Sequence, residues 1–150
     1  MQSITKPKPI PQAYHSVTPF LVVDGAAELI EFMKETFNAE GQEAVKGSDG
    51  RIAHAELRVG DSVVMLADST AKYSPVASQL YVYLDNVDQT YLRALKAGGT
   101  SVQEPADQFY GDRTAGVKDP TGNFWWIATH VEDVTPEELQ RRMKARSNQQ

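Results

Sequence analysis

The spacing of apolar residues along the chain changes from a helical period to an alternating one. Between residues 24 and 37, apolar side chains recur three or four positions apart, as on a helix with one apolar face. These residues are Ala26, Leu29, Ile30, Met33 and Phe37. A β-rich stretch at Ser16–Val23 precedes them, so we expect a strand there and take Asp24 as the N-cap of the helix.

The residues that follow the helix alternate instead. In the stretch 51–59, Ala55 and Leu57 fall on one side and His54 and Glu56 on the other, as in a strand with one buried face. The dipeptide at 60–61 is Gly-Asp, which predicts a turn into a strand at 62–67. We therefore expect an antiparallel hairpin.

The same order of elements returns in the second half. The pattern predicts a strand at 79–85, a helix at 87–97 and a short strand at 100–103, followed by strands at 113–118 and 123–129. An offset of 62 residues aligns the two halves without gaps and places Asp24 on Asn86 and Gly60 on Gly122. We predict two modules, at 14–70 and 76–132, within one domain at 14–147.

The two ends of the chain differ from this repeat. Residues 1–13 are rich in Lys and Pro and predict a disordered tail. Thr135, Pro136 and Glu138 form a capping box with Pro at the first helical position, which predicts a short helix at 135–146.

The composition of the chain argues against several classes of function. The chain has 150 residues and a net charge of −5, which argues against nucleic-acid binding. It has no cysteine, so disulfides and thiolate metal sites are excluded. No signal peptide and no apolar run long enough for a bilayer is visible. We expect a cytoplasmic protein that contacts neither nucleic acid nor membrane.

Several segments resemble a known group. They are Val17–Asp24, His54–Leu57, Tyr110–Arg113, Asp119–Asn123 and Trp125–His130. Together they are similar to the glyoxalase, bleomycin-resistance and extradiol-dioxygenase superfamily, also called vicinal oxygen chelate proteins, and most of all to its PhnB-like branch. The resemblance implies an α+β fold in which two tandem βαβββ modules form a cupped mixed sheet, with a short C-terminal helix added. It also implies a homodimer, in which the modules are sometimes exchanged.

The resemblance further implies where a metal would be bound. Relatives that use a metal take His or Glu ligands from the first and last strand of each module. The corresponding positions here are Val17, Val64, Gln79 and Trp126, and three of these side chains cannot coordinate a metal. We therefore expect no cofactor and disfavour a divalent metal.

The same strands predict a ligand-binding surface. Side chains expected on the cup face are Gln79, Tyr81, Tyr83, Phe124 and Trp126, which suit a flat, apolar or cationic molecule. Phe109 lies in an aromatic loop, and Arg113 after it can hold a carboxylate or phosphate. The aromatic residues are equally consistent with core packing, and Arg113 with a bridge to an Asp that holds the loop.

His54 and Glu56 share one face of their strand and form a candidate acid–base pair, or else a structural pair. With His130 they would make a displaced metal site. Three functions stay open: a metal-free protein that binds a small aromatic or amphipathic molecule, an enzyme such as a lactoylglutathione lyase-like isomerase or a dioxygenase, and an interaction module with a vestigial pocket. We rank binding first.

Overall fold

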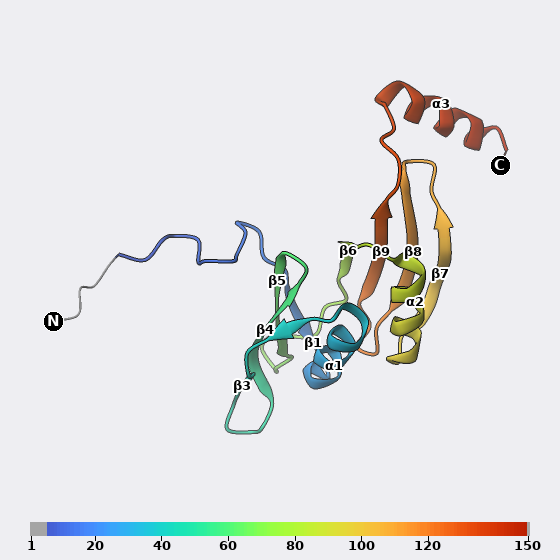
Figure 1. Ribbon diagram of the computed structural model, residues 1–150. Coiled ribbons are helices and arrows are strands. Elements are labelled where there is room, and N and C mark those ends of the chain that lie inside the picture. The colour runs from blue at the N-terminus through green and yellow to red at the C-terminus, as the bar shows by residue number, and fades with distance from the viewer. Residues whose placement is uncertain (1–5, 150) are drawn as a thin grey trace. The chain divides into compact units, whose positions relative to one another are not determined.

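The computed structural model describes residues 6–149, so the first five residues of the predicted tail lie outside the described part. Residues 6–13 carry neither helix nor strand. The chain divides into two compact units, Met1–Val76 and Ala77–Gln150, each of which has its own mixed sheet (Figure 1).

The first unit builds its sheet around a long hairpin. Its elements are β1 (Phe20–Val23), α1 (Ala26–Phe37), β2 (Glu40–Gly41), β3 (Val45–Lys46), β4 (Ile52–Val59) and β5 (Ser62–Asp68). The strand order is β1-β5-β4-β2, and β3 also pairs with β4. β1 runs parallel to β5, whereas β4 and β5 form the predicted antiparallel hairpin with Leu57 opposite Val64.

The second unit repeats this plan. Its elements are β6 (Gln79–Tyr83), α2 (Val87–Lys96), β7 (Thr100–Asp107), β8 (Asp112–Lys118), β9 (Phe124–His130) and α3 (Pro136–Ser147). The strand order β6-β9-β8-β7 matches that of the first unit, and β6 is again parallel to the last strand. The α+β class, the tandem βαβββ order and the C-terminal helix are thus confirmed.

Three predicted details of the elements are wrong. β1 begins at Phe20, after Pro19, and not at Ser16. The N-cap of α1 is Gly25 with φ 98°, and Asp24 makes no cap hydrogen bond. β7 runs through Pro105 to Asp107, because it is the edge strand of its sheet and irregular register accommodates the missing N–H.

The repeat offset is 61 residues rather than 62 for most of the module. The buried positions of α1, which include Ala26 and Leu29, correspond at this spacing to Val87 and Thr90 of α2. The N-caps Gly25 and Asn86 differ by the same number, and so do the strand pairs Phe20 with Met65 and Tyr81 with Trp126. Because side chains alternate along a strand, the one-residue error transfers a predicted position to the opposite face of the sheet.

In each unit one face of the sheet packs against a helix, α1 on β4 and β5 and α2 on β7, β8 and β9. The buried side chains Leu29 and Met33 of α1 and Trp125 and Ile127 of β9 form these two cores. Across residues 6–149, no helix combines the length and apolar character needed to cross a membrane.

Candidate functional site

The open face of the second sheet, opposite α2, carries an aromatic surface. Tyr81 and Tyr83 of β6 are 43% and 62% exposed. Gln79 pairs with Phe124 and Tyr81 with Trp126, so all five predicted side chains lie on this face. We call these five residues the aromatic surface. The sequence placed them together correctly because β6 alternates strictly.

Two contacts fix the Trp126 indole on this surface. Gly116 lies opposite Trp126 in the register, and a Cβ atom on Gly116 would lie 2.6 Å from the indole ring. The ring therefore lies flat against the bare backbone of β8. Its Nε1 donates to Gln79 Oε1 at 2.9 Å. The indole is held in one orientation although part of it faces solvent.

Asp112 anchors the other end of the aromatic surface. Its Oδ2 accepts hydrogen bonds from the Tyr81 and Tyr83 hydroxyls at 2.6 and 2.9 Å. Its Oδ1 lies 2.8 Å from His130 Nδ1, and His130 Nε2 lies 2.7 Å from Asp133 Oδ1. Both ring nitrogens thus face carboxylate oxygens, which only accept hydrogen bonds, so both contacts are hydrogen bonds only when the imidazole is doubly protonated.

The electrostatics agree with this arrangement. Burial alone would raise the pKa of Asp112, but hydrogen bonds from Tyr81, His130 and Tyr83 outweigh it and lower that pKa. The bonds to Asp112 and Asp133 raise the pKa of His130. Burial and then the bond to Asp112 raise the pKa of Tyr81, so its hydroxyl keeps its proton at neutral pH.

His54 and Glu56 form a second polar cluster, in the first unit. Glu56 lies opposite Met65 on the open face of the first sheet, and His54 Nε2 is 3.0 Å from Glu56 Oε1. The Tyr14 hydroxyl donates to the other oxygen of Glu56, and Phe20 stacks on His54 with the ring centroids 6.5 Å apart. The hydrogen bond from His54 and then that from Tyr14 lower the pKa of Glu56. The pair has the geometry of a base and its orienting group.

The structure separates Arg113 and Phe109 from the aromatic surface. Arg113 follows Asp112 on β8 and therefore faces the side of the sheet that α2 covers. It donates to Asp88 of α2 at 2.9 and 2.8 Å and to Asp107 of β7 at 3.2 Å. The predicted alternative, a bridge to an Asp, thus describes its contacts, with Asp88 and Asp107 as partners.

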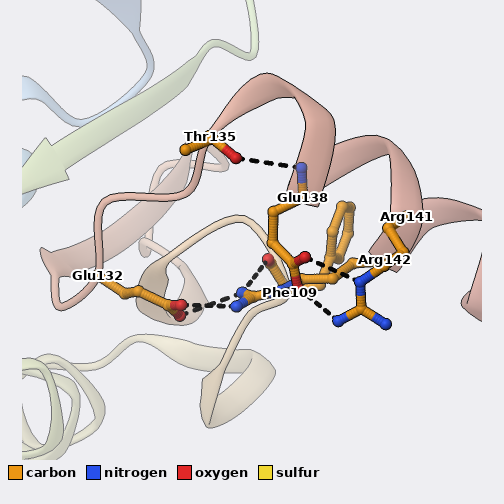
Figure 2. Close-up of polar contacts among 6 residues, drawn as sticks. All are labelled: Phe109, Glu132, Thr135, Glu138, Arg141 and Arg142. Atoms are coloured by element: carbon orange, nitrogen blue, oxygen red, sulfur yellow. Dashed lines mark hydrogen bonds and ion pairs between the residues drawn. The ribbon is translucent and has the colours of Figure 1, made fainter.

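Phe109 belongs instead to the attachment of α3 (Figure 2). Its carbonyl oxygen accepts from Arg142 at 2.9 Å, and the Arg146 guanidinium lies 4.2 Å from its ring centroid. Arg142 also pairs with Glu132 and Glu138. These contacts hold the C-terminal helix against the β7–β8 connection and leave the Phe109 ring covered by a cation of this chain.

The positions at which related proteins bind a metal do not offer a suitable donor set. Val64 is 4% exposed and faces α1, so the 62-residue offset placed that position on the wrong side of the sheet. With the 61-residue offset, Thr18 and Met65 replace Val17 and Val64 as the expected positions in the first unit. The positions in the second unit, Gln79 and Trp126, stay the same. None of these side chains is the imidazole or carboxylate that a first-row divalent cation prefers. Among residues 6–149, no three His, Cys, Asp or Glu side chains are arranged to hold a metal ion, and His130 has partners of its own in the second unit.

A cavity of about 470 Å³ also lies on the open face of the first sheet. Phe20, Val22 and Ala67 form its floor, and Arg51, Ser69 and Tyr73 lie at its sides. Sequence analysis missed this cavity because the loops 47–51 and 69–73 that wall it carry no periodic pattern. It also missed Asp112 as an anchor. The register of the second hairpin, which places Asp112 opposite His130, is the feature that identifies these two residues as neighbours.

Comparisons with known proteins settle the family. The family model described as Glyoxalase/Bleomycin resistance protein/Dioxygenase superfamily matches residues 14–127. The chain belongs to this superfamily. An uncharacterized protein of Mycobacterium bovis is 35% identical over 146 residues, which cover 89% of this chain and 95% of that protein. An uncharacterized protein of Mycobacterium tuberculosis is 35% identical and covers the same share of this chain and 85% of its own length.

Solved structures of the superfamily share the fold. TioX from Micromonospora sp. ML1 has a TM-score of 0.64 at 22% identity, covering 78% of this chain and 99% of TioX. A glyoxalase/bleomycin resistance protein/dioxygenase family enzyme from Burkholderia phytofirmans PsJN has a TM-score of 0.63 at 17% identity, covering 76% of this chain and 97% of that one. At this identity the likeness extends to the fold alone, and the PhnB-like branch stays a prediction.

Proposed function

We propose that this superfamily member binds a small flat molecule, aromatic or amphipathic, on the aromatic surface of its second unit and does so without a metal. The observation that carries the proposal is that Tyr81, Tyr83 and Trp126 are part-exposed yet held by Asp112, Gln79 and Gly116. Exposed aromatic rings that are fixed in advance lose little entropy when a ligand stacks on them. The acidic chain and the ring faces favour neutral or cationic compounds.

Binding to the aromatic surface is tested with two planar probes, 9-aminoacridine as the cation and 2-naphthol as the neutral compound, titrated by calorimetry. Trp126→Ala removes the largest ring and is expected to weaken binding on the order of tenfold, the scale of a lost stacking partner. Leu92→Ala is the matched control, because Leu92 is a 63% exposed apolar residue on α2, which covers the opposite face of the sheet. Equal affinities of the two variants would contradict the proposal.

The metal-free part of the proposal rests on the side chains at the four ligand positions. Metal analysis of the purified protein, together with calorimetric titration of zinc, nickel, manganese and iron(II), tests it. We expect no stoichiometric metal and no saturable heat. A bound cation whose affinity falls on changing Gln79 to Ala would refute it.

A second candidate function is acid–base catalysis by His54 and Glu56. The 3.0 Å contact between them, with Tyr14 on the far oxygen of Glu56, favours it over an incidental surface pair. Incubation of a planar probe that binds in the calorimetric titration, followed by mass spectrometry, shows whether the probe is converted. His54→Gln should then abolish conversion and leave binding intact, whereas conversion that persists in His54→Gln excludes this pair.

We further propose a homodimer in the cytoplasm. The absence of cysteine supports the cytoplasm, and the exposed apolar side chains Val17, Val45 and Val76 of the first unit support the dimer. Light scattering coupled to gel filtration measures the mass directly. A monomer at tens of micromolar would contradict the proposal.

A further inference from the structure

The cavity of the first unit has an apolar floor, and of the described residues that line it Arg51 alone is cationic. Phe20, Val22 and Ala67 lie on the open face of β1 and β5, and the walls come from the loops on either side. The volume of about 470 Å³ lies in the range of small-molecule sites. Its aromatic rings, Phe20 and Tyr73, are both more than half exposed, at 54% and 60%. An apolar ligand body therefore finds surface to cover.

The carboxylates around the cavity are already engaged by donors of this chain. Asp68 accepts from the backbone N–H groups of Gly25 and Ala26 with one oxygen and from that of Ile52 with the other, at 3.2, 2.8 and 2.8 Å. Those bonds lower the pKa of Asp68 even though burial opposes them. Asp49 Oδ1 accepts from the Arg51 backbone N–H at 3.0 Å. Asp68 and Asp49 thus accept hydrogen bonds from the backbone and make no hydrogen bond to the guanidinium of Arg51.

The guanidinium of Arg51 makes only loose contacts. Within the described residues its contacts are made by Nη2 alone, at 3.5 Å from Ser69 Oγ and 3.7 Å from Asp24 Oδ1. Both distances lie at the long end for a hydrogen bond or an ion pair. Arg113, by comparison, makes three contacts between 2.8 and 3.2 Å. Nε and Nη1 of Arg51 have no partner among residues 6–149, and Nη2 is held only by its two long contacts. Either edge of the guanidinium, Nε with Nη2 or Nη1 with Nη2, matches the two oxygens of a carboxylate.

We propose that this cavity binds a small monocarboxylate, with its apolar or aromatic body on Phe20 and Val22 and its carboxylate on Arg51. The acidic residues near Arg51 favour a ligand with one negative charge over a ligand with two. Asp24 lies 3.7 Å from the guanidinium, and Asp68 is close enough for the charge of Arg51 to help lower its pKa. A phosphate dianion therefore meets more repulsion from these acids than a carboxylate does. The site lies in the first unit and does not rest on the function proposed for the aromatic surface.

The test compares three naphthalene probes by calorimetry on the full-length protein. They are naphthalene-2-carboxylate, its neutral carboxamide, and 2-naphthyl phosphate. We expect saturable binding of the carboxylate, with affinity lower on the order of tenfold or more for the carboxamide, the scale of a lost charged hydrogen bond. The phosphate should also bind more weakly than the carboxylate. These comparisons use the unaltered chain, so they hold even where a variant fails to fold.

Two matched variants then locate the site. Arg51→Gln should reduce carboxylate affinity to that of the carboxamide, whereas Arg58→Gln removes an exposed cation from the same strand region and should not. The same series is repeated in Trp126→Ala, which weakens any binding of the naphthalene ring to the aromatic surface. The preference for the carboxylate and its loss in Arg51→Gln should both persist in that background. Any of three results would overturn the proposal. The carboxylate could show no saturable binding at millimolar concentration, or the carboxamide could bind with equal affinity. The third result is a loss of carboxylate binding in Trp126→Ala in place of Arg51→Gln.

Discussion

The two units share one connectivity and differ in what their open faces carry. At the middle of the last strand, Met65 in the first unit corresponds to Trp126 in the second. Opposite these residues stand Glu56 and Gly116. The glycine lets an indole lie flat on the backbone, whereas the glutamate places a carboxylate next to His54. The same fold thus presents an aromatic surface in one unit and a His54–Glu56 contact and a cavity in the other.

The units also begin their helices differently. Asn86 caps α2 with its own side chain, which accepts from Gln89 N at 3.1 Å. The N-terminus of α1 is bound by Asp68 from β5, the fourth strand after the helix in the sequence. The first unit therefore ties its helix to its last strand through one carboxylate, and we expect the two helices to respond differently to loss of their caps.

The largest expected effect is that of Asp68→Ala. Three backbone N–H groups lose their acceptor, and we expect the free energy of unfolding to fall by about 3 kcal/mol. Asn86→Ala removes one cap bond and should cost about 1 kcal/mol. Urea unfolding followed by circular dichroism measures both. Equal losses would mean that the first helix does not depend on the strand for its cap.

The next effect concerns Gly116. In Gly116→Ala the new Cβ would meet the Trp126 ring at 2.6 Å, so the ring must leave its position. We expect a loss of about 1.5 kcal/mol, typical of overpacking, and loss of the bond to Gln79. Denaturant titration gives the free energy of unfolding, and tryptophan emission, with Trp126→Ala as the reference for Trp125 alone, reports the new environment of Trp126.

A double-mutant cycle isolates the cause. In a Trp126→Ala background the clash has no partner, so Gly116→Ala should cost clearly less there. The same cost in both backgrounds would show that Gly116 acts through the backbone of β8 and not through the indole.

Sequence periodicity was enough for the fold and for the face that carries the aromatic residues, but not for the polar groups and loops around them. Strict alternation in β6 and the helical spacing of α1 located both modules and the aromatic surface. The offset between modules was in error by one residue, because Asp24 looked like a cap and Asp68, 44 positions later, performs that task. A cap supplied from another strand leaves no local pattern. The Asp112 anchor and the Arg51 cavity depend on pairing register and loop conformation, which a single sequence does not encode locally.

The pH dependence of stability should distinguish the units, because the second holds the Asp112–His130 pair. The pKa of His130 is raised, so its contribution is complete below about pH 6.5 and is lost as pH rises through the raised value. The pKa of Asp112 is lowered, so its contribution is present above about pH 3.9 and is lost as pH falls through the lowered value. Between these limits the pair stabilises the second unit.

Stability curves from pH 3 to 9 test this, with His130→Gln as the variant and His15→Gln as the control. The control lies in the first unit, where His15 Nε2 contacts only the backbone oxygen of Asp61 and, at 4.0 Å, its carboxylate. We expect the decline of stability as pH rises through the raised pKa of His130 to vanish in His130→Gln and to persist in His15→Gln. NMR titration of His130 gives its pKa directly, and a value at or below that of a free histidine would contradict the geometry.

The smallest effect is expected at α3, which has no buried residue and is held by charges. Arg142 donates to Glu132 at 2.6 Å and to Glu138 at 2.9 Å, and Glu138 in turn binds Arg141, as Figure 2 shows. The bonds from Arg141 and Arg142 lower the pKa of Glu138 to about 2. Exposed ion pairs contribute little to global stability and weaken in salt. Arg142→Ala should therefore leave the unfolding midpoint almost unchanged and yet speed amide exchange in α3 several-fold.

Lys144→Ala removes the same charge two residues further along the helix and is the matched control. Molar salt should reproduce the Arg142→Ala exchange pattern in the unaltered protein, because both treatments weaken the same pairs. The β-strands of the second unit, whose core holds Trp125 and Ile127, should keep their protection throughout. If α3 and these strands lost protection together, the helix would be part of the cooperative core of its unit, and its attachment would not be the electrostatic contact that the distances describe.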